Sequence, residues 1–376
     1  MFDFLLFTVL AVAVVWIATR ILLRAPDHSS FDEPIVDSAG SRSQASAEIG
    51  EVHRLLGDMA NELQDVPRRE QTGALRRIMD EGLLGAPVKA EDLGVTTKAA
   101  DAGGVPAEWV LAPGADATRR LLYIHGGGFY AGSPTSARML TAALSKLCGV
   151  AVLSIDYRLL PENRRMDSVV DCQRAYRWII DNGPDGSAVA DQVFVAGDSA
   201  GGNLTLMLSA WAQDENVRSM DGVIVFSPST DSTLEGKSFR ANIATDPMLG
   251  PALGFFARMP ATLKALLGLL LSRVNPRNPI VSPLFGRLDN LPPTLVQASD
   301  CEMLIDDARR YVNKAISQGS PAELQTWPGM VHVFQMFSHV LPESTEALEN
   351  VAHFVAKQGV AGRASNEAPA PSAQAV

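Results

Sequence analysis

The stretch QVFVAGDSAGGNLTLMLSAWAQ, residues 192–213, holds three patterns in succession. An apolar, β-rich run comes first, the small residues Gly197-Asp198-Ser199-Ala200-Gly201 follow, and a run of helix formers ends it. A GxSxG motif between a strand and a helix forms a sharp turn that exposes the serine hydroxyl. The helix start behind such a turn offers free amides and a partial positive charge to a developing anion. The stretch therefore predicts a strand–turn–helix unit with Ser199 as a nucleophile.

The same alternation continues on both sides of this unit. Short β-rich runs alternate with helical stretches of ten or more residues, at 107–113, 120–125, 150–157, 192–197, 222–228, 293–299 and 322–328. Several runs are apolar on both faces, which is typical of a parallel sheet covered by helices on either side. We therefore expect an α/β fold with a mostly parallel, doubly wound sheet of about eight strands. Functional groups belong at the carboxyl ends of its strands.

Two helical regions fall outside the alternation. Residues 46–87 contain two patterns with apolar residues at helical spacing, and residues 232–285 contain the strongly apolar run 251–274. We expect the first to form N-terminal cap helices and the second a cap insertion in a catalytic domain of residues 88–360. Together they would form a lid over an apolar pocket. The alternative for the insertion is a helical hairpin packed on the body.

The two ends of the chain differ from the body in composition. Residues 4–19 are uncharged and apolar, and Arg20 and Arg24 follow them, so we expect a membrane-anchor helix over residues 1–24. A cleaved signal peptide and a buried core helix are the alternatives. The positions of the arginines favour a single-pass anchor in the cell (inner) membrane with a cytoplasmic catalytic domain. Residues 25–45 are predicted to be a flexible linker, and residues 361–376 a disordered tail.

Composition narrows the classes of partner. The formal net charge of -10 and the pI near 5.1 disfavour nucleic acid as a partner. The three cysteines, Cys148, Cys172 and Cys301, form no CxxC pair, so neither a disulfide framework nor a zinc site is expected. No metal and no organic cofactor is predicted.

A second glycine motif, His125-Gly126-Gly127-Gly128-Phe129, follows the run 120–125. Consecutive glycines leave their backbone amides unshielded, and acyl transfer needs such donors aimed at the tetrahedral oxyanion. The alternative is a flexible turn or a phosphate loop, but the Lys-Ser/Thr ending of a P-loop is absent. We interpret His125 itself as a structural residue.

These motifs resemble those of the hormone-sensitive-lipase-like family of bacterial carboxylesterases, which have the α/β-hydrolase fold. The likeness covers residues 88–358 and includes HGGGF, a near match to YRLAPE at 157–162, GDSAGGN, Asn242, Asp246-Pro247 and WPGMVHVF. Within the family, VPAEWV, SPLF and GMVHVFQMF look closest to monoterpene ε-lactone hydrolases. The resemblance implies an oxyanion hole formed by Gly127, Gly128 and Ala200, with residues 157–162 supporting the site. It also implies a possible homodimer.

Elimination and the resemblance both select His332 as the general base. Of the six histidines, His332 is the one that follows a predicted strand through a glycine-containing loop, which matches the order Ser, acid, His of this fold. The acid belongs in the loop after 293–299, which contains Asp300 and Glu302. The family pattern places Glu302 in register, although most members carry Asp there, and Asp300 remains the alternative.

The sequence thus predicts a serine carboxylic-ester hydrolase that acts on short- to medium-chain acyl esters through an acyl-enzyme. A lactone hydrolase that uses the same three residues is an alternative. A second alternative, from another class, is a non-catalytic protein that binds a small ligand on the same fold.

Overall fold

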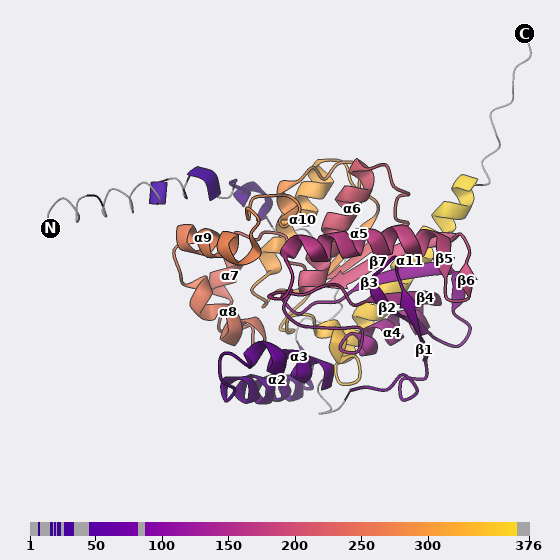
Figure 1. The fold of residues 1–376 in the computed structure, drawn as a ribbon, viewed down its shortest axis with the longest axis horizontal. Helices are drawn as coiled ribbons and strands as arrows, with labels where there is room; N and C mark the ends of the chain where they lie inside the picture. The colour runs from indigo at the N-terminus through magenta and orange to yellow at the C-terminus, as the bar shows by residue number, and fades with distance from the viewer. Residues whose placement is uncertain are drawn as a thin grey trace, which may run out of the picture.

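A computed structural model describes residues 7, 16, 17, 19, 21–23, 26–33, 45–81 and 87–366 of the chain, the last eight as backbone only. Its centre is an eight-stranded sheet in the order β1-β2-β4-β3-β7-β8-β9-β10 (Figure 1). The antiparallel edge is formed by β1 and β2, and all pairs from β4 to β10 are parallel. The strands are β1 Thr96–Asp101, β2 Pro106–Leu111, β3 Asp116–Ile124, β4 Val150–Ile155, β7 Gln192–Asp198, β8 Gly222–Phe226, β9 Thr294–Ser299 and β10 Ala322–Trp327. The mostly parallel sheet predicted from the sequence is confirmed.

Helices cover both faces of the sheet. They are α2 Ile49–Gln64, α3 Gln71–Glu81, α4 Arg138–Cys148, α5 Arg165–Asp181, α6 Ser199–Asp214, α7 Ser238–Ala241, α8 Leu249–Ala257, α9 Ala261–Ser272, α10 Ile305–Ser317 and α11 Pro342–Asn366. The shorter elements are the hairpin β5 Asn182–Gly183 and β6 Gly186–Ser187, and the 3-10 turns η1 Ser29–Phe31, η3 Pro283–Phe285 and η4 Phe334–Phe337.

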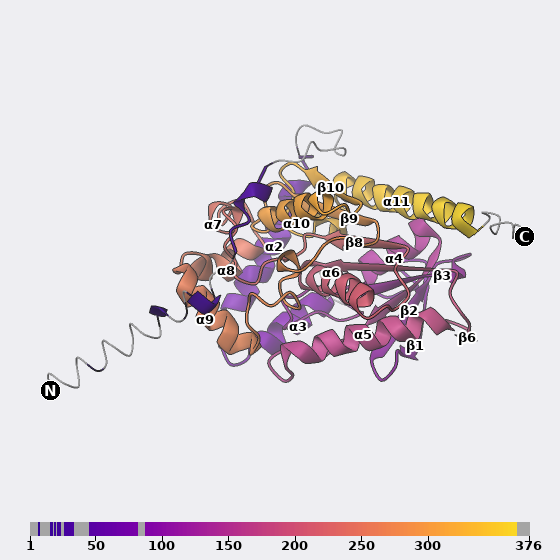
Figure 2. The same ribbon diagram turned by 90° about the horizontal axis from the view of Figure 1, so that it is seen from above.

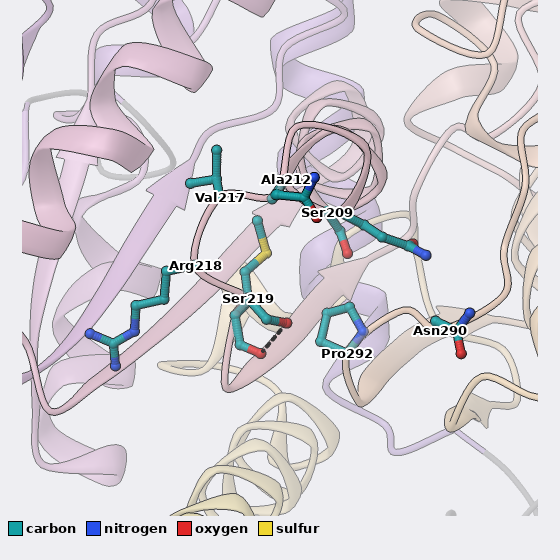
Figure 3. A pocket seen from close by; sticks show the side chains of 10 residues that line it. Ser209, Ala212, Val217, Arg218, Ser219, Asn290 and Pro292 are labelled. Atoms are coloured by element: carbon teal, nitrogen blue, oxygen red, sulfur yellow. Dashed lines mark hydrogen bonds between the residues drawn. The ribbon is translucent and has the colours of Figure 1, made fainter.

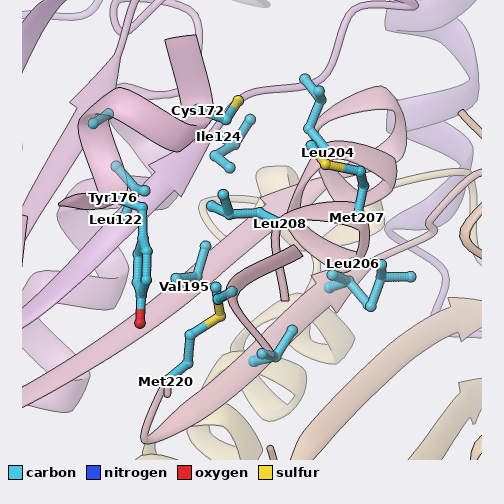
Figure 4. Close-up of a cluster of buried hydrophobic side chains, with 14 of the residues drawn as sticks. Leu122, Ile124, Cys172, Tyr176, Val195, Leu204, Leu206, Met207, Leu208 and Met220 are labelled. Carbon is cyan, nitrogen blue, oxygen red and sulfur yellow. The ribbon is translucent and has the colours of Figure 1, made fainter. Parts of the chain in front are cut away.

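The central strands are apolar on both faces because each face is a core. Leu122 and Ile124 of β3 belong to a cluster with α5, α6 and α10, whereas Leu121 and Tyr123 belong to a second cluster with α4 and α11. Figure 4 shows the first cluster, in which Leu204 of α6 and other helix side chains pack on these strands. This two-sided burial explains the near-continuous apolar runs in the sequence.

The sequence did not predict strand β1, and the reason is physical. Its residues, TTKAAD, are mostly exposed, so they show no apolar alternation. An edge strand of this kind is recognised through its pairing with β2 rather than through its own pattern.

The helices α2, α3, α7, α8 and α9 gather at one end of the molecule, opposite the β5–β6 hairpin, in both views (Figures 1 and 2). The predicted helical regions at 46–87 and 232–285 therefore hold helices on the same side. Arg76 of α3 donates hydrogen bonds to the carbonyl oxygens of Tyr130 and Leu160 and pairs with Glu162. These contacts fasten α3 to the loops that follow β3 and β4.

Part of the predicted linker is held against the body, which corrects the expectation of flexibility for residues 26–33. Asp32 pairs with Arg310 and with Lys237, and His28 stacks on Phe285 with ring centroids 5.1 Å apart. Asn313 also donates to the carbonyl oxygens of this segment. The partners lie more than 200 residues away along the chain, so local composition could not reveal them.

The C-terminal helix is longer than expected. Helix α11 continues to Asn366, past the predicted start of the tail at residue 361; residues 358–366 contain no proline to interrupt it. The rest of the tail lies outside the described residues, as do most residues of the predicted anchor 1–24. Among the helices that the structure describes, none is by itself long and apolar enough to cross a membrane; α8 and α9 pass such a test only as a pair bent by 115°.

Candidate active site

Ser199 lies in the sharp turn between β7 and α6. Its φ of 51° is in the left-handed region, which non-glycine residues adopt at a cost of about 1–3 kcal/mol, often at functional sites. A Cβ atom at Gly201 would overlap the carbonyl oxygen of Ile124, and one at Gly197 would crowd Thr205 and Gly201. Gly201 is therefore required by the close approach of β3 and α6, and Gly197 by that of β7 and α6.

The structure brings Ser199, His332 and Glu302 together from three different loops. The Nε2 atom of His332 is 2.9 Å from the Ser199 hydroxyl oxygen, and its Nδ1 atom is 3.2 Å from Oε2 of Glu302. His332 is 2% exposed and Glu302 is fully buried. In this arrangement the carboxylate orients the imidazole and the imidazole faces the hydroxyl, as nucleophilic serine catalysis requires.

The pKa values of His332 and Glu302 depend on burial and on the contact between the two side chains. With Ser199 they form a trio of side chains. Burial by itself lowers the pKa of His332, but the hydrogen bond and charge of Glu302, together with the charges of Asp246 and Asp198, raise this pKa above its usual 6.5. Burial raises the pKa of Glu302, and the contact with His332 opposes that rise. The carboxylate thus favours the imidazolium that forms when His332 accepts a proton.

Asp300, the alternative acid, points elsewhere. Its Oδ1 atom accepts a hydrogen bond of 3.0 Å from the amide of Gly329, and its side chain is exposed. Asp300 thereby joins the loop after β9 to the loop that carries His332. It has no contact with the imidazole, whereas Glu302 has one.

The glycine loop after β3 lies beside the nucleophile turn. Gly127 and Gly128 have φ values of 109° and 64°, and no other described residue accepts a hydrogen bond from their amides. The amide of Ala200, in the first turn of α6, has no partner within its helix because of its position. Asp198 holds this loop in place by accepting hydrogen bonds from the amide of Gly126 (2.9 Å) and the Tyr123 hydroxyl (2.6 Å).

Three supporting residues had not been assigned a role from the sequence. Ser227, directly after β8, accepts a hydrogen bond of 3.0 Å from the amide of Val333, the neighbour of His332. Asp246 is buried; its Oδ1 accepts hydrogen bonds from the first amides of α8, and its Oδ2 accepts the amide of Met303 at 2.9 Å. Asp198 is the third. Asp246 belongs to a short motif that the resemblance singled out, but only the fold shows which backbone groups it holds.

A cavity of about 310 Å³ lies away from this site (Figure 3). It is lined by residues at the end of α6 and at the starts of β8 and β9: Ser209, Ala212, Gln213, Asn216, Val217, Arg218, Ser219, Met220, Asn290 and Pro292. Since parallel strands start at this edge of the sheet and end at Ser199, the cavity belongs to the opposite side. Among the described residues, no cluster of three or more His, Cys, Asp or Glu side chains is arranged to hold a metal ion.

Comparison with known proteins places this geometry in a family. The family model for the alpha/beta hydrolase fold matches residues 121–336. An acetyl-hydrolase of Streptomyces hygroscopicus is 35% identical over 254 residues, which are 67% of this chain and 80% of that protein. An esterase of Acinetobacter venetianus is 33% identical over 251 residues, which are 67% and 78% of the two chains.

A solved structure refines the assignment. The crystal structure of an esterase from the bacterial hormone-sensitive lipase family has a TM-score of 0.70 and 33% identity, covering 83% of this chain and 98% of that one. The chain belongs to the bacterial hormone-sensitive lipase family. The fold and family expected from the sequence are confirmed, whereas the likeness to monoterpene ε-lactone hydrolases stays a prediction. In this member of the hormone-sensitive lipase family, a glutamate, Glu302, contacts the histidine where the sequence pattern of most members has aspartate.

Proposed function

We propose that the protein hydrolyses carboxylic esters through a covalent acyl-enzyme on Ser199. The chain is an ester hydrolase of the carboxylesterase type, as its relatives indicate: they carry the names acetyl-hydrolase, esterase and carboxylesterase/phospholipase. The observation that carries the mechanism is the continuous chain of contacts from the Ser199 hydroxyl through both nitrogens of His332 to Glu302.

The proposed reaction has two steps. The Nε2 atom of His332 takes the proton of Ser199 as the hydroxyl oxygen attacks the ester carbonyl, and then gives this proton to the leaving alcohol. Water activated by the same nitrogen attacks the acyl-enzyme, and the acid leaves as the Ser199 proton is restored. Amides of Gly127, Gly128 and Ala200 would bind the oxyanion in both steps; losing one such donor typically costs about 10²–10³-fold in turnover.

Short- to medium-chain acyl esters are the proposed substrates. The cap helices and the loop after β9 share an apolar cluster in which Phe239, Met303 and Leu304 are buried and Leu253 and Phe256 pack against them. This cluster closes the end of the molecule next to Glu302 and would limit the room for an acyl chain. Profiling p-nitrophenyl esters of graded chain length, together with a few lactones, tests both the size preference and the lactone alternative.

The decisive test of the mechanism is Ser199→Ala. Turnover of p-nitrophenyl butyrate should fall by about 10⁴-fold or more, while circular dichroism shows an unchanged fold. In the parent chain, a phosphonate ester should add the mass of one phosphonyl group to the tryptic peptide that contains Ser199. In the variant, the same peptide should gain no mass. Full activity in the variant would refute the nucleophile; absence of turnover in the folded parent would favour the non-catalytic ligand-binding alternative.

Membrane attachment through residues 1–24 is also proposed. Its support is the apolar run at 4–19 and the two arginines that follow it. Carbonate extraction of cells that express the full chain should leave the enzyme in the membrane pellet, and a chain that lacks residues 1–24 should move to the supernatant. Equal release of both forms would contradict the anchor. A homodimer, which the family resemblance suggested, is tested by the mass of the detergent-solubilised chain in solution.

A further inference from the structure

The outer side of the α8–α9 pair exposes large apolar side chains. Phe255 of α8 is 78% exposed, and Leu270 and Leu271 of α9 are 64% and 61% exposed. The opposite side packs on the body through small buried residues, Ala257 and Ala265 among them. The two helices therefore present apolar side chains both to the protein and to the outside, unlike an ordinary surface helix.

Exposed apolar side chains are concentrated at this end of the molecule. Of twelve strongly exposed large apolar residues among those the structure describes, nine lie in the N-terminal segment or the α8–α9 pair: Phe7, Trp16, Ile17, Ile21, Leu22, Phe255, Leu263, Leu270 and Leu271. The other three, Leu147, Val189 and Ile316, are scattered over other elements. Scattered single residues are normal on a surface, whereas a cluster marks a contact site.

The N-terminal segment reaches the body beside α9. Arg277, after α9, donates hydrogen bonds to the carbonyl oxygens of Leu22 (3.2 Å) and Ile21 (3.4 Å), and Asn275 donates to the former at 3.5 Å. Both views show this segment meeting the body next to α9 (Figures 1 and 2). Its apolar residues and those of the pair thus lie at one end of the molecule.

The stretch of chain that contains the pair carries basic residues and no acidic ones. Between Asp246 and Asp289 there is no Asp or Glu, although five basic residues occur there: Arg258, Lys264, Arg273, Arg277 and Arg287. The nitrogen of Lys264 is turned inward to the carbonyl oxygen of Leu234, and Arg287 pairs with Asp289, so Arg258, Arg273 and Arg277 are left at the surface. The pair and the loop after it thus carry a local excess of positive charge in a chain of net charge -10.

We propose that the outer face of α8–α9, defined by Phe255, Leu263, Leu270 and Leu271, binds the surface of an anionic phospholipid bilayer. Neither helix can span it, since nine and twelve residues make rods of about 14 and 18 Å against a hydrocarbon core of about 30 Å. The pair lies in the interface, with apolar side chains among the acyl chains and arginines at the lipid phosphates. A second copy of the chain fits worse, because a symmetric contact would set these arginines against each other.

Docking in this way would bring the candidate active site close to the bilayer. Asp246 joins the start of α8 to the amide of Met303, the neighbour of Glu302. The lipid-binding face is therefore one layer of helix away from the trio. Binding of this face to a bilayer does not depend on ester hydrolysis.

The test places an environment-sensitive fluorophore on the face. Full-length Leu271→Cys, and separately Phe255→Cys, is labelled with a nitrobenzoxadiazole maleimide. The matched control is Val189→Cys, which is 69% exposed and lies two residues after β6, the hairpin strand at the opposite end (Figure 1). The unsubstituted chain, in which Cys301 is partly exposed, gives the labelling blank. Vesicles of phosphatidylcholine, with and without phosphatidylglycerol, are then added.

Probes at both cap positions should shift their emission to the blue with vesicles, more strongly with phosphatidylglycerol and less as salt is added, because salt screens the charge attraction. The probe at position 189 should not respond. If the protein floats with the vesicles while the cap probes stay unshifted, the N-terminal segment alone holds it and the proposal fails. A blue shift that appears without vesicles and grows with protein concentration would overturn it in favour of a second copy.

Discussion

At the scale of single residues, three of the eight described non-glycine residues with a positive φ lie around the imidazole of His332. Ser199, Ser227 and Val333 have φ values of 51°, 47° and 50°, although none is a glycine. Each such conformation costs about 1–3 kcal/mol and persists only where surrounding contacts enforce it. The hydrogen bond from the Val333 amide to the Ser227 hydroxyl is one of these contacts. The strain is the cost of bringing a turn from β8 and a turn from the histidine loop to the same point.

Glu302 and Asp300 can be separated by paired substitution. Glu302→Ala should lower kcat by about 10⁴-fold, because the imidazole loses the group that fixes its tautomer and stabilises its cation. Asp300→Ala removes a neighbouring charge and the hydrogen bond to Gly329, without touching the imidazole, and should cost less than about tenfold. Steady-state kinetics on p-nitrophenyl butyrate measure both.

The matched pair also controls for damage to the loop. Asp300 is exposed and Glu302 is buried, so urea unfolding should accompany the kinetics. If Asp300→Ala caused the larger loss of kcat while keeping its stability, the assignment of the acid would pass to Asp300.

At the scale of elements, Asp246 links the cap to the acid loop. Its Oδ1 atom accepts a hydrogen bond from the amide of Leu249 at the start of α8, and its Oδ2 atom accepts one from the amide of Met303. Its negative charge also helps to raise the pKa of His332. A shift of α8 would therefore move the backbone beside Glu302. This buried carboxylate and Asn242, which donates a hydrogen bond to the carbonyl oxygen of Glu302, both couple the cap to the acid loop.

Asp246→Asn tests that coupling through pH. His332 acts as a base only when neutral, so kcat/KM should rise with pH through a midpoint above 6.5 in the parent. Removing the charge of Asp246 lowers the pKa of His332 and moves this midpoint to lower pH. The measurement is the pH profile of kcat/KM, followed at the isosbestic wavelength of p-nitrophenol. A midpoint that stayed in place would show that the charge of Asp246 does not reach the imidazole.

Sequence patterns predicted the elements that repeat a local rule and missed those that depend on distant partners. The strand and turn around Ser199 could be read from residues 192–203, because burial on both faces and a sharp turn both constrain local composition. Strand β1, the docked segment at 26–33 and the role of Asp246 could not, because each is defined by a partner far along the chain. Spacing alone also could not decide between Asp300 and Glu302 as the acid. Both lie in one loop, and only the fold shows which of the two side chains points to His332.

At the scale of the whole molecule, a buried acidic pair ties stability to pH. Asp307 and Asp231 are each 2% exposed; Oδ2 of Asp307 accepts the amides of Thr230 and Asp231, and Oδ1 of Asp231 accepts the amide of Thr233. Burial and the charge of Asp231 raise the pKa of Asp307 to about 8. Burial also raises the pKa of Asp231, and the hydrogen bonds from Thr233 and the charges of Arg310 and His28 oppose that rise; Arg310 opposes the rise at Asp307 as well.

The consequence for unfolding has a definite sign. An unfolded aspartate releases its proton near pH 4, whereas folded Asp307 keeps its proton to about 8, so the folded state binds more protons between these values. The contribution of this group to stability is present below pH 4 and is lost as pH rises toward 8.

Asp307→Asn is neutral throughout and keeps an oxygen for the amides of Thr230 and Asp231. Its melting temperature should therefore fall less than that of the parent between about pH 5 and about pH 8.5. Thermal unfolding by circular dichroism measures this, with Asp185→Asn in the exposed β5–β6 turn as a control that should follow the parent. Parallel curves for Asp307→Asn and the parent would mean that Asp307 is already ionised in the folded enzyme, held so by Arg310.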